Sequence, residues 1–369
     1  MSGLVAGGRD GVMGRDGSRV IAAGYGEVTV VVDEQDDPFY TQAALEAHCP
    51  GEGRIAVHPT PASGHPAALA HDVLYALGKR LAPGPCSPDV WLDSLDAAWL
   101  AAASWAQATG VRHAVIARAH LLTPRRIDQL LTWRTVTGVQ LTLLWQTEAR
   151  ALPPVLAQVE RRLGGKDSFG ALLAEPGPIP ARPSFPPGSP LPSVPGAEAV
   201  AGISRQSSAG PPREPGPTSA RPGRQAVACT GAMATARLGP VAPAVGVAAQ
   251  STAVLLALAH PLAAGALSVL AFTRAGLGSL RWTRDLDITG DVSVIKVHGV
   301  AHRSCVLYAV SDWARPLLAA ARAYHRLGSG PLHGSVFAPV MRCEARHLRA
   351  HAGRHPCLSL SLPACALLP

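Results

Sequence analysis

Short apolar runs alternate with longer amphipathic stretches through the first half of the chain. Four runs of β-branched and other apolar residues predict buried strands at residues 27–32, at residues 54–58, from residue 114 onward and at residues 139–145. Between and after them, apolar positions with helical spacing predict helices at residues 41–48, 66–81, 90–107 and 154–163. Strands that alternate with helices of this length predict a parallel sheet covered on both faces, which is an α/β fold.

A further helix, between the third and fourth strands, has the clearest start signal. Thr123 is a residue type that caps helix N-termini, and Pro124 has the fixed backbone angle suited to the first helical position. His113 and His120 flank the third strand, where we expect them to satisfy backbone groups and not to bind a metal. The spacing of four tryptophans predicts core packing between helices and sheet: Trp91, Trp99, Trp105 and Trp133.

A segment rich in Pro, Gly and Ser separates this half from a second ordered region. Residues 171–235 lose the apolar periodicity and predict a linker between an α/β domain at residues 27–170 and a second domain at residues 236–338. The second domain is predicted to be mainly helical, with a small β-hairpin formed by residues 292–297 and 305–310 and an amphipathic helix at residues 312–327. Residues 1–26 predict a disordered N-terminus, and residues 339–369 predict an irregular tail.

Residues 238–272 carry no charged side chain, and their length satisfies the criterion for a membrane span. Against a span, the stretch holds prolines, Gln250 and His260, and it has no interfacial Trp or Tyr belt. Two short buried helices broken at His260-Pro261 are therefore favoured, and a membrane-embedded stretch is the alternative. The chain starts without an apolar segment after basic residues, so no secretory signal is predicted and a cytoplasmic location is expected.

Charge and cysteine content exclude few classes of function. Lys and Arg number 33 against 25 Asp and Glu, which gives a net charge of +8. A charge of this sign permits contact with nucleic acid or an anionic surface, but the basic residues form no long run. The 7 cysteines are widely spaced and include no Cys-x-x-Cys pair, so neither a zinc site nor a disulfide framework is predicted.

Residues 114–146 have the order strand, turn, helix, strand, and they follow the predicted strands at residues 27–32 and 54–58. In this order the first half resembles the AAA+ ATPases that serve bacterial transposition and secretion systems. The resemblance implies a P-loop after the first strand, rich in glycine and carrying a lysine that pairs with phosphate oxygens. It also implies carboxylates at the end of the third strand, where they hold Mg²⁺.

The chain lacks the residues that would do this chemistry. Residues 33–38 (DEQDDP) contain four carboxylates and neither Gly nor Lys, and Ala117-Arg118 stand where the second pair of carboxylates is expected. Such a loop repels a triphosphate. Asp33, Asp36 and Asp37 carry oxygen ligands, but their spacing is not that of a calcium loop, so a solvated acidic loop is predicted. We therefore expect no ATP hydrolysis, no cofactor and no metal.

The sequence AFTRAGLGSLRWTRDLDITGDVSVIKVHG, aligned on Asp285-Leu286-Asp287, resembles the catalytic core of the tyrosine recombinases. The alignment implies that Arg274 stands at the position of the first catalytic arginine, which in that family clamps the scissile phosphate. Leu277 replaces the glutamate that usually follows. His302 in the predicted hairpin turn and Arg354 in the run HAGRH are the other candidate recombinase-like residues.

The same comparison shows what the second half lacks. The predicted hairpin turn has no lysine to act as general acid, since Lys296 is on the strand. The family's nucleophile is a tyrosine after the HxxRH motif, whereas the last tyrosine here is Tyr324, which precedes it. Covalent strand transfer would have no attacking group.

Together these features predict a non-catalytic, DNA-associated protein related to the proteins of mobile elements and recombination. The expected partners are double-stranded DNA and a transposase or ATPase. DNA contacts, mainly to phosphates, are expected from Arg274, Arg281, Arg284 and Arg303. The alternatives are a regulatory module that makes protein contacts only, and a protein associated with a membrane through residues 238–272.

Overall fold

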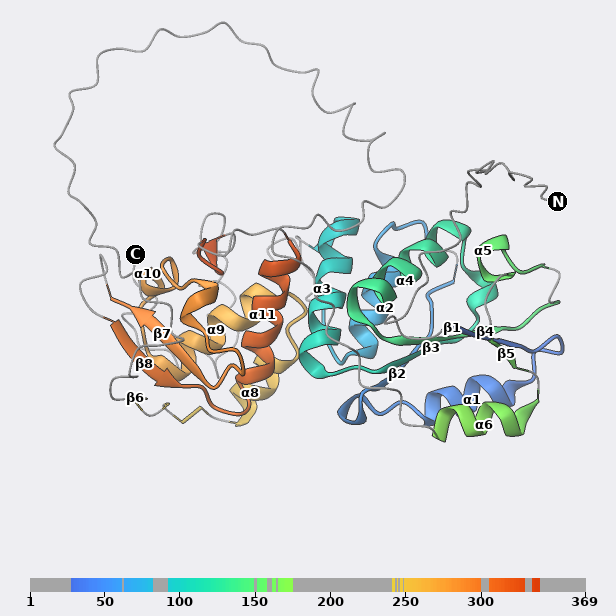
Figure 1. The fold of residues 1–369 in the computed structure, drawn as a ribbon, viewed down its shortest axis with the longest axis horizontal. Coiled ribbons are helices and arrows are strands. Elements are labelled where there is room, and N and C mark those ends of the chain that lie inside the picture. The colour runs from blue at the N-terminus through green and yellow to red at the C-terminus, as the bar shows by residue number, and fades with distance from the viewer. Residues whose placement is uncertain are drawn as a thin grey trace, which may run out of the picture.

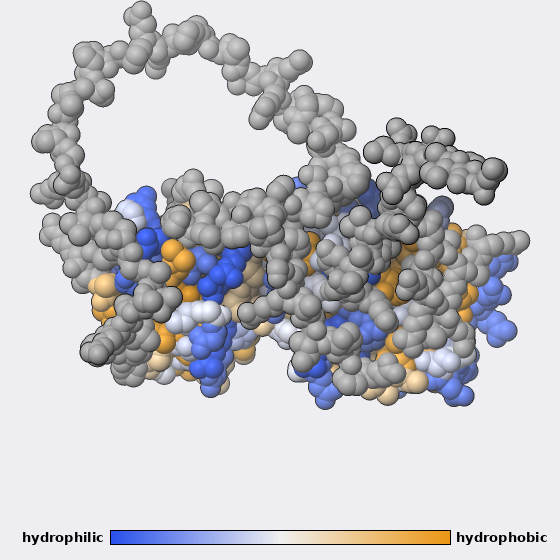
Figure 2. All heavy atoms as spheres, viewed as in Figure 1, coloured by the Kyte–Doolittle hydropathy of each residue, from blue (hydrophilic) through white to orange (hydrophobic). Residues whose placement is uncertain are grey.

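A computed structural model describes two packed parts of the chain, an α/β part and a mainly helical part (Figure 1). Hydrophilic and hydrophobic residues are interspersed over the visible face of both (Figure 2). The described residues are 28–61, 63–81, 92–148, 151–157, 161–163, 165–174, 241–242, 244, 246–247, 249–299, 305–328 and 334–338.

Parallel strands form the sheet of the α/β part, in the order β2-β3-β4-β1-β5. All residues of β3 and β4 are buried, because helices cover both faces of the sheet. The strands are β1 (Val28–Val32), β2 (Arg54–Val57), β3 (His113–Ile116), β4 (Gln140–Trp145) and β5 (Arg161–Leu163).

Helices lie on opposite faces of this sheet. One face carries α1 (Pro38–Glu46) and α6 (Lys166–Ala174), and the other carries α2 (Ala68–Ala76), α4 (Pro124–Thr137) and α5 (Pro154–Ala157) (Figure 1). Side chains alternate between the two faces along each strand. Val31 and Leu144 therefore pack with Tyr40 of α1 and Phe169 of α6. Val30 and Leu143 belong to the core on the other face.

Local signals in the sequence explain the ends of two helices. Ser94 caps α3 (Leu95–Thr109) by accepting a hydrogen bond from the Ala97 amide, and Gly110 ends it in the left-handed conformation. Thr123 caps α4 in the same way, with Pro124 at the first helical position, as predicted. Short 3₁₀ turns complete the part at Pro50–Glu52 and Ala119–Leu121.

The helical part is built around α9, in which every residue is buried. It packs against α11 and α3. Gly265 allows the close approach to α11, because a Cβ there would lie 2.6 Å from the Cβ of Ala321. The elements are α8 (Ala249–Leu256), α9 (Pro261–Thr273), α10 (Leu277–Leu280), the 3₁₀ turn η5 (Asp285–Asp287), α11 (Arg315–Leu327), and the strands β6 (Val241–Ala242), β7 (Val294–His298) and β8 (Cys305–Ala309).

Two carbonyl groups, one at the end of α8 and one between α8 and α9, accept hydrogen bonds from the α/β part. Lys79 Nζ donates to the carbonyl of Leu256 at 2.7 Å and lies 3.5 Å from the centre of the Trp105 ring. Trp105 Nε1 donates to the carbonyl of Ala259 at 2.6 Å. Because α3 also contacts α9 and α11, apolar side chains from both parts form one continuous core. The boundaries drawn from the sequence stay predictions.

Most of the predicted elements are confirmed. Residues 238–272 contain two short helices, and His260 caps the second with Pro261 at its first position. No helix among the described residues is long and apolar enough to cross a membrane. The hairpin is confirmed as the antiparallel pair β7–β8. Trp105 and Trp133 are buried in the core, while Trp91 lies outside the described residues.

Two predictions on the α/β part are wrong. The helix expected at residues 154–163 ends at Ala157, and residues 161–163 form the edge strand β5. Pairing with β1 decides this assignment, since Arg161-Arg162-Leu163 has no apolar alternation of its own. Helix α6 was not predicted and reaches Ala174, so the start of the expected linker is helical. The predicted N-terminus (residues 1–26) and tail (residues 339–369) lie outside the described residues.

Candidate functional site

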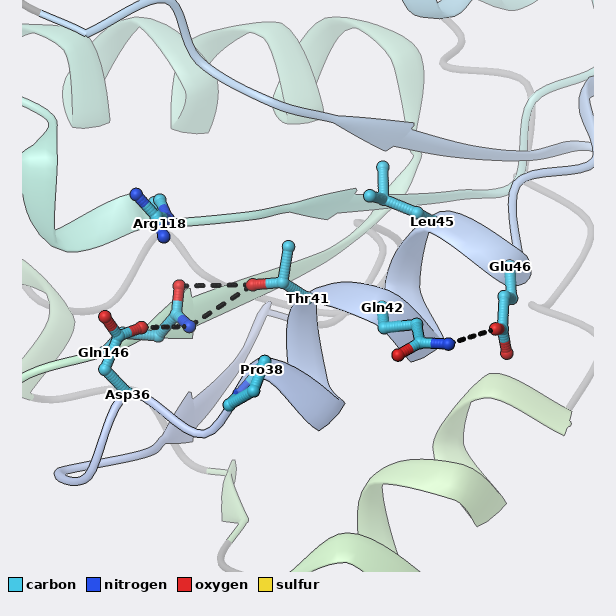
Figure 3. A pocket seen from close by; sticks show the side chains of 8 residues that line it. All are labelled: Asp36, Pro38, Thr41, Gln42, Leu45, Glu46, Arg118 and Gln146. Carbon is cyan, nitrogen blue, oxygen red and sulfur yellow. Dashed lines mark hydrogen bonds between the residues drawn. The ribbon is translucent and has the colours of Figure 1, made fainter.

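A cavity lies at the carboxyl edge of the parallel sheet. Strand β1 continues into α1 on one face, and its neighbour β4 leads to α5 on the other face (Figure 1). Such a reversal is the topological switch point at which open α/β sheets bind their ligands. The cavity has a volume of about 580 Å³ and is lined by Asp36 after β1, Arg118 after β3, Gln146 after β4 and one face of α1 (Figure 3).

Gln146 fixes this end of the cavity. Its Nε2 atom donates to Asp36 Oδ1 at 2.7 Å and to Thr41 Oγ1 at 3.2 Å (Figure 3). Its backbone amide donates to His120 Nδ1 at 3.3 Å, so this histidine satisfies a backbone group, as predicted. The buried Gln146 thus connects the loop after β1, helix α1 and the turn after β3.

Two lining residues have a backbone conformation that side chains disfavour. Asp36 has a φ of 50° and Arg118 a φ of 48°, both in the left-handed region. Each costs on the order of 1 kcal/mol or more, and such strain collects at ligand sites and switch regions. The hydrogen bond from Gln146 Nε2 anchors the Asp36 side chain.

The N-terminus of α1 is closed by the chain's own carboxylate. Asp37 Oδ1 accepts a hydrogen bond from the Phe39 amide at 2.9 Å, and Pro38 has no amide hydrogen to offer. Lys166 Nζ lies 2.6 Å from Asp37 Oδ2. The hydrogen bond between them lowers the pKa of Asp37 and raises the pKa of Lys166. A helix N-terminus can bind an external phosphate, but here Asp37 occupies that position.

The prediction of a solvated acidic loop after β1 is wrong for Asp33. Asp33 is only 7% exposed, and its Oδ1 accepts a hydrogen bond from the Gln35 amide at 3.3 Å. The loop folds back onto the sheet because the Asp33 amide donates to the carbonyl of Trp145. Within the described ranges, no group of three or more His, Cys, Asp or Glu side chains could hold a metal.

His113 makes a side-chain contact where a backbone contact was expected. Its Nε2 atom lies 2.8 Å from Thr142 Oγ1 on the neighbouring strand. Burial lowers its pKa to about 4, with a smaller contribution from Arg54. The ring is therefore neutral at physiological pH and is part of the sheet's core.

In the helical part, Asp285 is a structural carboxylate. It is 1% exposed and accepts hydrogen bonds from Arg322 Nε at 2.7 Å and Arg326 Nη2 at 2.8 Å. Burial alone would raise the pKa of Asp285, but the hydrogen bonds from Arg326 and Arg322 outweigh it and lower the pKa. The carboxylate thereby ties η5 to α11.

Asp287 ties the same turn to the hairpin. His298 Nε2 lies 3.0 Å from Asp287 Oδ2, and the backbone amide of Arg284 donates to the same oxygen at 2.8 Å. Burial opposes ionisation of Asp287, but the hydrogen bond with His298 and that from the Arg284 amide lower its pKa. The Arg284 side chain also contacts Asp287, at 3.3 Å. Arg284, one of the arginines expected to contact DNA, is therefore half-buried and paired with a carboxylate.

Two of the other candidate residues are on the surface. Arg274 ends α9 with a φ of 53° and is exposed, and Arg281 is exposed just after α10. Within the residues that the structure describes, no ion pair involves either guanidinium. His302, Arg303 and Arg354 lie outside those residues.

Tyr324, the last tyrosine of the chain, packs against the helical core. Its ring centre lies 5.3 Å from that of His260, and burial raises its pKa to about 12. Burial also lowers the pKa of His260 to about 3. Neither side chain carries charge at neutral pH, and both stabilise the contact between α9 and α11.

Several residues of these networks could not be found from the sequence. Arg322 and Arg326 are one helical turn apart, which predicts that they share a face of α11, but nothing local indicates Asp285 as their partner. Nothing near Lys166 or Gln146 in the sequence indicates the contacts with Asp37 and Asp36 that the fold gives them. No family model, curated protein or solved structure matches the chain.

Proposed function

We propose that this chain is a non-catalytic, DNA-associated protein whose helical part contacts the phosphates of duplex DNA. The observation that carries the proposal is the arrangement of charge between α9 and β7. Asp285 and Asp287 face inward and are paired with internal partners, whereas Arg274 and Arg281 stay exposed. Exposed guanidinium groups without a nearby acidic partner favour contacts with phosphate.

Trp282 adds an apolar contact beside Arg281. It is 39% exposed, although most large apolar side chains of this part are in the core. Arginine and aromatic side chains together are suited to nucleic acid, because the arginine pairs with phosphate and the ring can contact a sugar or base. The resemblance to tyrosine recombinases supports the same surface, since it places Arg274 at a phosphate-binding position.

The α/β part is proposed to be a scaffold without nucleotide chemistry. Its parallel sheet is compatible with the resemblance to AAA+ ATPases. The place for a phosphate at the start of α1 holds Asp37 and its partner Lys166, and the third strand is followed by Ala117-Arg118. We therefore propose a protein that is not an enzyme and that works in the cytoplasm with a transposase or ATPase.

The membrane alternative is not carried into the proposal. Helix α9 holds the most apolar part of residues 238–272, and all of it is buried against α3 and α11. Insertion into a bilayer would have to expose this core. The alternative of a purely protein-binding module makes the opposite prediction to ours for DNA.

A salt titration of binding to duplex DNA tests the proposal. We expect saturable binding of the full chain at low ionic strength, with an affinity that falls as salt rises. Arg281→Ala should weaken binding to all sequences and reduce the salt slope by about one unit. Arg315→Ala, which removes an exposed arginine paired with Asp312, is the control. Absence of binding at low salt would overturn the proposal in favour of the protein-binding module.

A further inference from the structure

We propose that the cavity at the carboxyl edge of the sheet binds a free basic amino acid, such as arginine or lysine. The proposal does not rest on DNA binding, because it concerns the other part of the molecule. It follows from the position of the cavity, from its lining along one face of α1 and from the charges at the two ends of that lining.

The cavity has the size and place of a small-molecule site. Its volume of about 580 Å³ lies within the range of roughly 300–1,000 Å³ that is usual for ligand pockets. It opens at the switch point between β1 and β4. One wall is α1, whose lining residues recur at helical spacing and so share one face: Pro38, Thr41, Gln42, Leu45 and Glu46. At 1.5 Å per residue this face is about 12 Å long, which suits an extended ligand.

The charges at one end match the head group of an amino acid. Asp36 supplies a carboxylate, which Gln146 Nε2 holds in place at 2.7 Å. Arg118 supplies a guanidinium that lies on the same side of the cavity (Figure 3), and no ion pair in the described part of the chain uses it. An ammonium group would pair with Asp36, and the neighbouring carboxylate of the ligand would pair with Arg118 in the two-point manner that suits a guanidinium.

The other end of the cavity carries a carboxylate, which suits a second cationic group on the ligand. Glu46 lies at the far end of α1, where its Oε1 accepts a hydrogen bond from Gln42 Nε2 at 2.8 Å (Figure 3). Leu45, 50% exposed, provides apolar surface beside it. An aliphatic stem could lie along this surface and bring a terminal ammonium or guanidinium to Glu46. A nucleotide fits poorly, since Asp36 and Glu46 repel its phosphates and Asp37 fills the start of α1.

Calorimetry on the full chain at neutral pH, with L-arginine, L-lysine, two analogues and ATP, tests this assignment. Agmatine lacks the carboxylate, norleucine lacks the terminal cation, and ATP is the anionic control. We expect saturable binding of L-arginine or L-lysine and no binding of ATP. Agmatine and norleucine should bind with affinities at least about tenfold lower. Failure of both basic amino acids to bind at about millimolar concentration would overturn the proposal. So would equal binding of agmatine, which would indicate a polyamine-type site.

Variants then locate the site. Arg118→Ala should remove the preference for L-arginine over agmatine, and Glu46→Gln should remove the preference for L-arginine over norleucine. Glu52→Gln, at an exposed glutamate outside the cavity, loses the same charge and should change neither preference. Unchanged selectivity in Arg118→Ala and Glu46→Gln, with an unchanged melting temperature to show that they are folded, would contradict the assignment. DNA binding by the same variants is measured separately, so the two proposals fail independently.

Discussion

The acidic clusters after β1 and at η5 place their carboxylates differently in the two parts of this protein. In the α/β part, Asp36 and Glu46 face an open cavity, and Asp37 is paired with a lysine at the surface. In the helical part, Asp285 and Asp287 are turned inward. The basic character of a surface is therefore set by which carboxylates the fold buries, and the composition of the chain alone does not reveal it.

The largest effect in this comparison is expected from Asp285→Ala. The substitution leaves the Arg322 guanidinium, whose side chain is 12% exposed, without its carboxylate. Breaking one partner of a buried pair costs about 3–5 kcal/mol of the free energy of unfolding, which denaturant titration measures. Asp312→Ala, at a carboxylate that is 92% exposed, should cost less than about 1 kcal/mol. Similar losses in both variants would show that Asp285 is not structural.

The junction between the two parts should make stability depend on pH. Burial lowers the pKa of Lys79 from 10.5 to about 7. The unfolded chain therefore binds a proton that the folded chain releases between these values, so stability should rise with pH from about 7 to 10.5, by at most about 1.4 kcal/mol per unit. Lys79→Met should flatten this rise, and denaturant titrations at several pH values measure it. An equal rise in the variant would assign the effect to other groups.

The close contact between α9 and α11 should tolerate no added methyl group. Gly265→Ala would place a Cβ at 2.6 Å from Ala321 Cβ, and overpacking of this kind costs about 1–3 kcal/mol. Gly278→Ala is the control, since a Cβ there meets nothing within 4 Å. We expect thermal unfolding to show a lower midpoint for the first variant only. An unchanged midpoint would mean that the helices separate at little cost.

The smallest stability effect is expected at a helix start in the α/β part. Thr123→Ala removes the cap of α4 and should cost about 1 kcal/mol. Thr132→Ala, within the same helix, replaces a hydroxyl that bonds only to the preceding turn, and alanine's helix propensity should compensate. Equal stabilities of the two variants by denaturant titration would show that the cap contributes nothing.

Local signals explain why much of the fold could be predicted. Thr123-Pro124 and His260-Pro261 each contain a cap and a first-position proline, and both mark helix starts in the structure. Strand β5 could not be predicted, because its residues become a strand only by pairing with β1. The contacts that organise the molecule are equally non-local. Lys79 and the Leu256 carbonyl are 177 residues apart in the sequence, and no spacing rule connects them.

The candidate site also combines residues placed by their position in the chain with contacts that depend on the fold. The sequence predicted a solvated acidic loop after the first strand and no ligand, whereas the structure places Asp36 after β1 and Arg118 after β3 in the lining of one cavity. The identity of its contacts depended on the fold, because Gln146 reaches Asp36 only after β4 has paired with β1. The resemblance to tyrosine recombinases used Asp285 and Asp287 only to align the chain, and the structure gives them a role by pairing them with α11 and β7.

The most direct test of the central claim compares two double variants with the same loss of charge. Arg274→Ala/Arg281→Ala removes exposed arginines from the helical part, and Arg118→Ala/Arg125→Ala removes exposed arginines from the α/β part. We expect the first variant to bind duplex DNA at least about tenfold more weakly, with a salt slope smaller by about two units. The second variant should match the unmodified chain. Equal weakening in both would rule out a DNA-binding surface on the helical part, because binding would then follow net charge and not the exposed arginines of that part.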